Sequence, residues 1–125
     1  MKVMLDTNIC IYIIKQQPMS VLERVATFPV GHLGISVITL TELEYGASKS
    51  SQPARNRDAL EQFVSPLEIV VFDRKATIVY GNTRALLEKR GRSIGSMDLL
   101  IAVHALSLNV PLVTKKVKEF RRVPG

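Results

Sequence analysis

Short apolar runs alternate with longer amphipathic stretches along this chain of 125 residues. The short runs are rich in Val, Ile and Leu, which is typical of strands buried on both faces of a parallel sheet. In the longer stretches the apolar residues recur with helical spacing. The predicted strands are residues 2–5, 33–36, 67–72 and 110–114. The predicted helices are residues 7–17, 18–28, 37–47, 54–64, 74–90 and 97–108.

Strands that alternate with helices in this way predict parallel βαβ units. We therefore expect a single α/β domain over residues 1–125, with a central, mostly parallel sheet of four or five strands and helices on both faces. Residues 115–125 indicate a basic turn and a short helix. The residues expected to cap helices are Thr7 or Asn8, Ser36, Asp73 and Ser96. The residues expected on the buried side of helix 74–90 are Ile78, Val79, Leu86 and Leu87.

The composition fits this fold and excludes several classes of protein. Hydrophobic residues make up 46% of the chain, enough for a sizeable core, yet no run of 18 apolar residues predicts a membrane span. No signal peptide is apparent, so we expect a cytoplasmic protein. The single cysteine, Cys10, excludes an intrachain disulfide framework and a zinc site built from several cysteines. Its apolar surroundings predict a buried bystander.

Three acidic residues follow predicted strands or begin a predicted helix. Asp6 comes directly after the first strand, Glu42 lies in the helix after the second strand, and Asp98 lies in the first turn of helix 97–108. Asp6 could simply cap its own helix, and Asp98 could stabilise a helix N-terminus. Helical periodicity does not separate Glu42 from Glu44. In a doubly wound sheet, however, the carboxyl ends of strands and the N-termini of the helices that follow meet at one edge.

Carboxylates gathered at one edge repel one another and lose hydration, which is costly unless a cation compensates. Oxygen ligands of this kind suit Mg²⁺ or Mn²⁺. Such an ion can polarise a phosphate and supply hydroxide for in-line attack. The acids therefore indicate a phosphodiesterase.

The net charge of +6 and the pI near 9.8 favour a polyanionic partner, although a solubilising surface would give the same balance. Because aromatic residues are few, we expect phosphate contacts and shape to dominate nucleic-acid binding, and base stacking to be minor. The basic residues expected to flank the acids are Arg90, Arg92, Lys115, Lys116, Lys118, Arg121 and Arg122.

A pair of histidines could cleave RNA without a metal, through the 2′-hydroxyl group. His32 lies in a predicted loop, and His104 lies in an apolar helix on roughly the opposite face from Asp98. We therefore interpret both histidines as core or surface residues.

Four segments resemble the PIN-domain ribonucleases, specifically the VapC toxins of bacterial toxin–antitoxin pairs: MLDTNICIY, SVITLTELEYGASKS, GRSIGSMDLLIAVHALSLNVPLVT and KEFRRVPG. The resemblance covers nearly the whole chain and keeps the order and spacing of the motifs. It implies a compact α/β fold, cleavage of RNA (often tRNA) with Mg²⁺ or Mn²⁺, inhibition by a VapB-type antitoxin, and a homodimer.

The same resemblance implies the site residues. The acids would be Asp6, Glu42 and Asp98, which separates Glu42 from Glu44. Relatives commonly carry Asn or Asp after the last strand, where this chain has Lys115 and Lys116, so Glu119 is the remaining candidate for a fourth acid. Polar positions that line the site in the family are matched by Thr7, Asn8 and Thr114. Substrate binding is expected of Arg92, Lys115 and Lys116 because of their positive charge and their place beside the acids, and not from the resemblance.

The expected function is thus a metal-dependent endoribonuclease that acts as a toxin. The alternative is a catalytically weakened PIN module that binds RNA or antitoxin without efficient cleavage, and the lysines after the last strand motivate it. A nucleotide-binding domain is disfavoured because the chain contains no GxGxxG or GxxxxGK[ST] segment.

Overall fold

A sheet of parallel strands organises the chain, in a computed structural model that describes residues 1–16, 19–29, 31–114 and 123. The order of its four described strands is β3-β2-β1-β4. The first strand in the sequence therefore lies inside the sheet, next to the last of the described strands. The strands are β1 (Val3–Leu5), β2 (Leu33–Ser36), β3 (Glu68–Val70) and β4 (Leu112–Val113).

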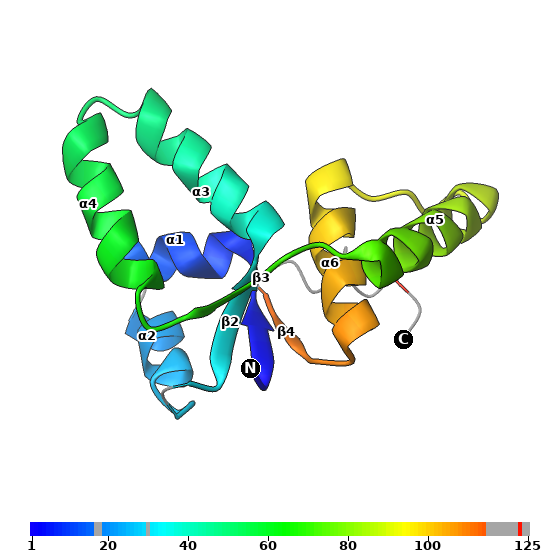
Figure 1. The fold of residues 1–125 in the computed structure, drawn as a ribbon, viewed down its shortest axis with the longest axis horizontal. Coiled ribbons are helices and arrows are strands. Elements are labelled where there is room, and N and C mark those ends of the chain that lie inside the picture. Colours follow the sequence, from blue (N-terminus) through cyan, green and yellow to red (C-terminus); the bar gives the residue numbers. More distant parts are fainter. Residues whose placement is uncertain (17–18, 30, 115–122, 124–125) are drawn as a thin grey trace.

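Six helices pack around this sheet in the described ranges (Figure 1). Their order is the predicted one, and each lies within a few residues of its predicted range. The helices are α1 (Thr7–Lys15), α2 (Met19–Val25), α3 (Val37–Lys49), α4 (Pro53–Val64), α5 (Arg74–Lys89) and α6 (Ser96–Leu108).

Successive residues of β1 are buried on opposite faces of the sheet. Leu5 packs with Ile9 and Ile35 in the core shared with α1, α3 and α4. Met4 packs with Ile101 of α6 on the other face. Figure 1 shows the same division, with α1 to α4 on one side of the sheet and α5 and α6 on the other. The prediction of a parallel sheet with helices on both faces is therefore confirmed.

The carboxyl ends of three strands meet at one edge. β1 leads into α1 through Asp6, and β2 leads directly into α3. In β4, Val113 pairs with Leu5, so the residue after β4 lies beside the residue after β1. This edge is where ligand sites of open α/β sheets occur.

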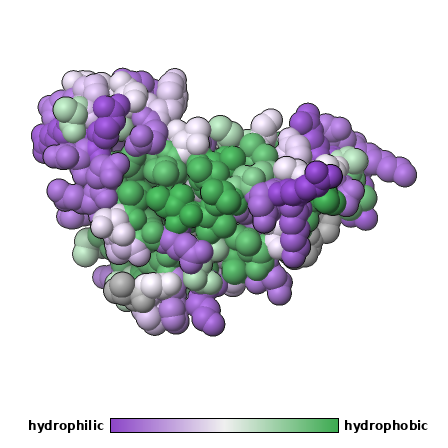
Figure 2. Space-filling model, viewed as in Figure 1, coloured by the Kyte–Doolittle hydropathy of each residue, from purple (hydrophilic) through white to green (hydrophobic). Residues whose placement is uncertain are grey.

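The third strand is shorter and more exposed than predicted. The sequence predicts a buried strand over residues 67–72, but β3 spans Glu68–Val70 only. Ile69 and Val71 are 40% and 69% exposed. The reason is the position of β3 at the end of the strand order, where β2 is its only partner among the described strands. Figure 2 shows apolar surface in the middle of the face that is turned to the viewer, in the region where Figure 1 draws β3.

Two predicted helix caps are wrong. Asp6, and not Thr7 or Asn8, caps α1, because its carboxylate reaches an amide of the first turn. Ser96 is already helical in α6, and Gly95 takes the cap position without a side-chain hydrogen bond. The alternative in which Asp6 caps its own helix is therefore confirmed.

The other caps are confirmed, since the side chains of Ser36 and Asp73 accept hydrogen bonds at the starts of α3 and α5. On α5, Leu87 is buried as predicted, whereas Ile78 is 57% exposed. α5 packs mainly on α6 and buries only a narrow stripe, and Ile78 lies outside that stripe. The expected turn and helix after Thr114 lie outside the described residues. No helix in the described part of the chain has the length and apolarity of a membrane span.

Candidate active site

Asp6 lies at the carboxyl end of β1 and is only 2% exposed. Its Oδ1 accepts a hydrogen bond of 2.9 Å from the Ile9 amide, and its Oδ2 accepts one from the Thr114 hydroxyl. The first bond comes from the start of α1, and the second comes from the end of β4. Both oxygens of this buried carboxylate are thus held in a fixed orientation by two elements.

Glu42 is tied to the same edge through the residue that follows Asp6. The Thr7 hydroxyl donates a hydrogen bond of 2.5 Å to Glu42 Oε1, which joins α1 to α3. The hydroxyl oxygen of Thr39, one turn earlier on α3, lies 3.4 Å from that of Thr7. Glu42 is half-buried and Thr39 is fully buried. The structure therefore links Asp6, Thr7, Glu42 and Thr114 at one edge of the sheet, and these residues are among those that the family resemblance implies.

Asp98 lies in the first turn of α6 and is half-buried. Helix α6 begins near α3 in the view of Figure 1, on the far side of the sheet from α1. Within the described residues, however, no group of three or more His, Cys, Asp or Glu side chains could hold a metal ion. The three predicted acids therefore do not form a closed metal cluster.

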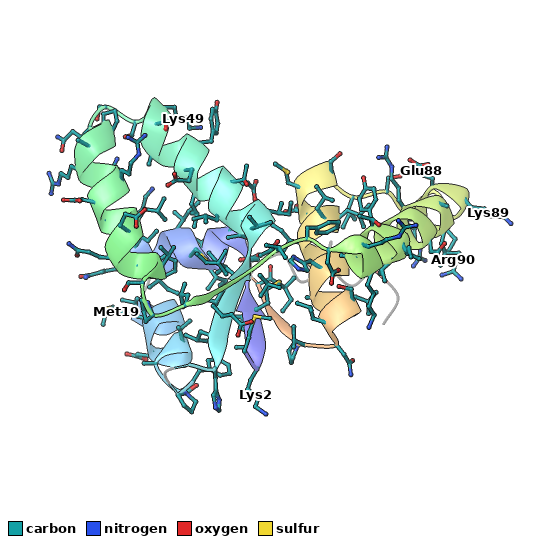
Figure 3. The ribbon with its side chains drawn as sticks, viewed as in Figure 1. Lys2, Met19, Lys49, Glu88, Lys89 and Arg90 are labelled. Atoms are coloured by element: carbon teal, nitrogen blue, oxygen red, sulfur yellow. The ribbon has the colours of Figure 1, made fainter. Side chains whose placement is uncertain are left out.

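The remaining predicted residues are more scattered. Asn8 is half-buried in the first turn of α1, and Arg92 is exposed in the segment before α6. Figure 3 shows Arg90 at the outer tip of α5, away from the carboxyl edge of the sheet, so the expectation that it flanks the acids is wrong. The predicted residues that lie outside the described part of the chain are Lys115, Lys116, Lys118, Glu119, Arg121 and Arg122.

The sequence analysis overlooked the hydroxyl group of Thr39. It is fully buried and faces Thr7, so it supports the hydroxyl that holds Glu42. Its spacing from Glu42, three residues along a helix, was the available signal, because such residues lie on one face.

Two buried titratable groups take no part in this site. Burial, and after it the Asp6 carboxylate, raise the pKa of Cys10, so its thiol stays protonated and the prediction of a buried bystander is confirmed.

Burial lowers the pKa of His104, which is 1% exposed. Its Nδ1 lies 2.7 Å from the Ser36 hydroxyl, and its ring packs edge-on against Phe72. His104 is thus a core histidine, as interpreted.

The donor set at the sheet edge fits a hard divalent cation. Its described members Asp6, Thr7, Glu42 and Thr114 contribute carboxylate and hydroxyl oxygens, and the Cys10 sulfur beside Asp6 is not ionised. Mg²⁺ is usually held by one or two carboxylates together with water. Asp6 and Glu42, linked through Thr7, supply two such carboxylates, and Asp98 is the third candidate.

The family model of the PIN domain matches residues 3–125. Ribonuclease VapC2 of Rickettsia felis is 46% identical to the chain, over 98% of the chain and 92% of that protein. The tRNA(fMet)-specific endonuclease VapC of Shigella flexneri is also 46% identical, over 100% of the chain and 94% of that protein.

Solved structures of toxin–antitoxin complexes resemble the fold closely. The DNA-bound VapBC complex of Salmonella typhimurium contains a chain with a TM-score of 0.93 and 44% identity, matched over 100% of this chain and 94% of that one. VapBC2 of Rickettsia felis, bound to a promoter DNA fragment, gives a TM-score of 0.88 and 46% identity over 99% of this chain and 94% of that one.

Proposed function

The chain belongs to the PIN-domain family, within its branch of VapC ribonucleases, and on this premise we propose that it is a metal-dependent endoribonuclease that acts as the toxin of a toxin–antitoxin pair. The observation that carries the proposal is the array at the carboxyl edge of the sheet. There Asp6 is fixed by Thr114 and Ile9, and Thr7 connects it to Glu42. We take residues 1–125 as one PIN domain.

PIN-domain nucleases use a divalent metal ion, and we propose Mg²⁺ or Mn²⁺ because the donors are all oxygens. Asp6, Glu42 and Asp98 would hold it, with Glu119 as the candidate for a fourth acid. When bound, the ion would activate a water molecule for attack on phosphorus and neutralise charge on the phosphate.

The side chains around the ion would position it and the RNA. The Thr114 hydroxyl and the Ile9 amide hold the Asp6 carboxylate, and such supporting bonds orient metal ligands. Thr7 does the same for Glu42. Asn8 would orient water at the start of α1. The proposed contacts to RNA phosphates are Arg92, Lys115 and Lys116.

We further propose tRNA as the substrate class, because a relative of 46% identity is named for cleavage of tRNA(fMet). The proposed partner is a VapB-type antitoxin, because the similar solved structures are VapBC complexes. We also propose that the chain forms a homodimer and that it acts in the cytoplasm.

The test replaces Asp6 by asparagine and measures cleavage of total tRNA by the purified protein with Mn²⁺. Asparagine caps helices about as well as aspartate, so Asp6→Asn should stay folded. Its cleavage activity should fall by about 100-fold or more, which exceeds the loss typical of a residue that only hydrogen-bonds to a metal ligand. The matched control is Asp73→Asn, because Asp73 caps α5 in the same way, through a bond of 3.0 Å to Ala76, outside the proposed site.

Two further outcomes decide the mechanism. EDTA should abolish cleavage, and the products should carry 5′-phosphate and 3′-hydroxyl ends, because water is the nucleophile. A 2′,3′-cyclic phosphate, or full activity of Asp6→Asn, would contradict the proposed reaction.

A second candidate is a module that binds RNA or antitoxin without efficient cleavage. The observation in its favour is that the described acids do not close into a three-residue metal cluster. In the same assay this candidate predicts RNA binding without cleavage at any Mn²⁺ concentration.

A further inference from the structure

Tyr45 is an aromatic side chain left in solvent beside the proposed active site. It is 65% exposed. It lies three residues after Glu42 on α3, and residues at this spacing are neighbours on one helix face. The ring therefore lies about one turn outward from a carboxylate of the site.

Lys49 completes the arrangement. Its Nζ lies 4.9 Å from the centroid of the Tyr45 ring, a cation–π geometry. Figure 3 shows Lys49 near the end of α3 farthest from the sheet. Glu42, Tyr45 and Lys49 thus form one stripe that leads from the site to the rim of the molecule. The stripe is about 10 Å long, from a rise of about 1.5 Å per residue.

We infer that Tyr45 and Lys49 bind an unpaired nucleotide of the RNA next to the cleaved phosphate, the base stacking on Tyr45 and the phosphate contacting Lys49. The inference rests on the proposed ribonuclease function. Stacking on an exposed aromatic ring and a lysine beside it is how single-stranded nucleic acid is held. Three stacked nucleotides rise about 10 Å, so the stripe matches a short single strand that leaves the site.

This stripe changes an expectation from the composition. Few aromatic residues predict that base stacking is minor, but one exposed ring beside the site offers a surface on which a single unpaired base can stack. A fully paired duplex keeps its bases stacked on one another, so its bases are not available to Tyr45.

The test measures binding of an RNA hairpin with an unpaired loop, in EDTA so that nothing is cleaved. Tyr45→Leu should weaken hairpin binding about tenfold or more, as expected for loss of one stacked base. Tyr45→Phe keeps the aromatic ring and should bind the hairpin as tightly as the wild type. Binding of a blunt duplex RNA should change little.

Lys49→Gln should weaken binding and lower the salt dependence by about one phosphate contact. Lys89→Gln, at the tip of α5 in Figure 3, is the matched control.

A direct signal comes from fluorescence, because the chain contains three tyrosines and no tryptophan. The hairpin should quench tyrosine emission in the wild type and less so in Tyr45→Phe. If the wild type binds no RNA and cleaves none, the proposed function and this inference both fail. If it binds and cleaves RNA but Tyr45→Leu matches it, this inference alone fails. It also fails if Tyr45→Leu spares RNA binding and weakens only antitoxin binding.

Discussion

At the scale of single residues, Asp6 combines two roles that are usually separate. Its carboxylate begins α1 by accepting from Ile9 and also forms the centre of the proposed site. The first role keeps the chain folded, and the second requires a negative charge. Because only the second role depends on charge, asparagine and alanine should affect the protein differently. Alanine should cost about 1 kcal/mol of folding stability in addition to activity.

His104 makes folding stability depend on pH. Burial lowers its pKa, and the nearby Val71 carbonyl and Asp73 oppose the shift only in part. Between that lowered pKa and the unfolded value of about 6.5, the unfolded chain binds a proton that the folded chain does not. The stability contributed by neutral His104 is therefore complete above about pH 6.5 and is lost as pH falls below it.

The measurement is urea unfolding at pH 7.5 and pH 5.5. The free energy of unfolding of the wild type should fall on acidification, by at most about 1.4 kcal/mol per pH unit for one proton. His104→Asn should be less stable overall but should show a flatter dependence on pH. His32→Asn, in the loop before β2, controls for the loss of a histidine elsewhere. An equal slope in wild type and His104→Asn would show that other groups cause the effect.

At the scale of elements, α1 and α3 share the hydrophobic core, and the Thr7 hydroxyl adds a polar contact between them. Thr7→Val keeps the shape of the side chain but removes the bond to Glu42, so the Glu42 carboxylate should lose its fixed orientation. We expect cleavage to fall about 10- to 100-fold with little loss of stability. Thr7→Ser should recover most of the activity. Thr77→Val, which removes an exposed hydroxyl bonded to Arg74 on α5, is the control. Equal activity of Thr7→Val and wild type would exclude this role.

The elements also show what the sequence could and could not reveal. The strand Leu33–Ser36 was predicted with its bounds, because the turn residues Pro29 and Gly31 precede it and the Ser36 cap begins the next helix. β3 was overestimated, because composition does not reveal that a strand lies at an edge of the sheet. The exposure of Ile78 was missed for a similar reason, since it depends on which neighbour α5 finds.

The site followed the same rule. Asp6 was predicted from its place after a buried strand, because strand ends converge in any parallel sheet. The link from Thr7 to Glu42 and the buried Thr39 depend on the angle at which α1 and α3 cross, which no sequence pattern encodes. The exposure of Tyr45 was not predicted, because the number of aromatic residues does not indicate where in the fold each of them lies.

At the scale of the whole molecule, the proposed metal ion should stabilise the fold as well as support cleavage. An ion that binds only the folded chain raises the free energy of unfolding by about 2.7 kcal/mol at 100 times its Kd. For a domain of this size that corresponds to a rise in Tm of about 10 °C. Mn²⁺ should produce this rise in the wild type and in Asp73→Asn, and a much smaller one in Asp6→Asn. An equal rise in all three proteins would mean that the ion binds elsewhere.

The capping role of Asp6 also bears on how such a gene can decay. A chain that carries Asp6→Asn would keep its helix α1, its core and its outer surface while losing its chemistry. Under the proposed function, in a cell that holds a second, intact copy of the toxin, this folded product would still occupy antitoxin molecules. Inactivation at this one residue would therefore create a competitor for the antitoxin, whereas a mutation that unfolds the chain would simply remove it.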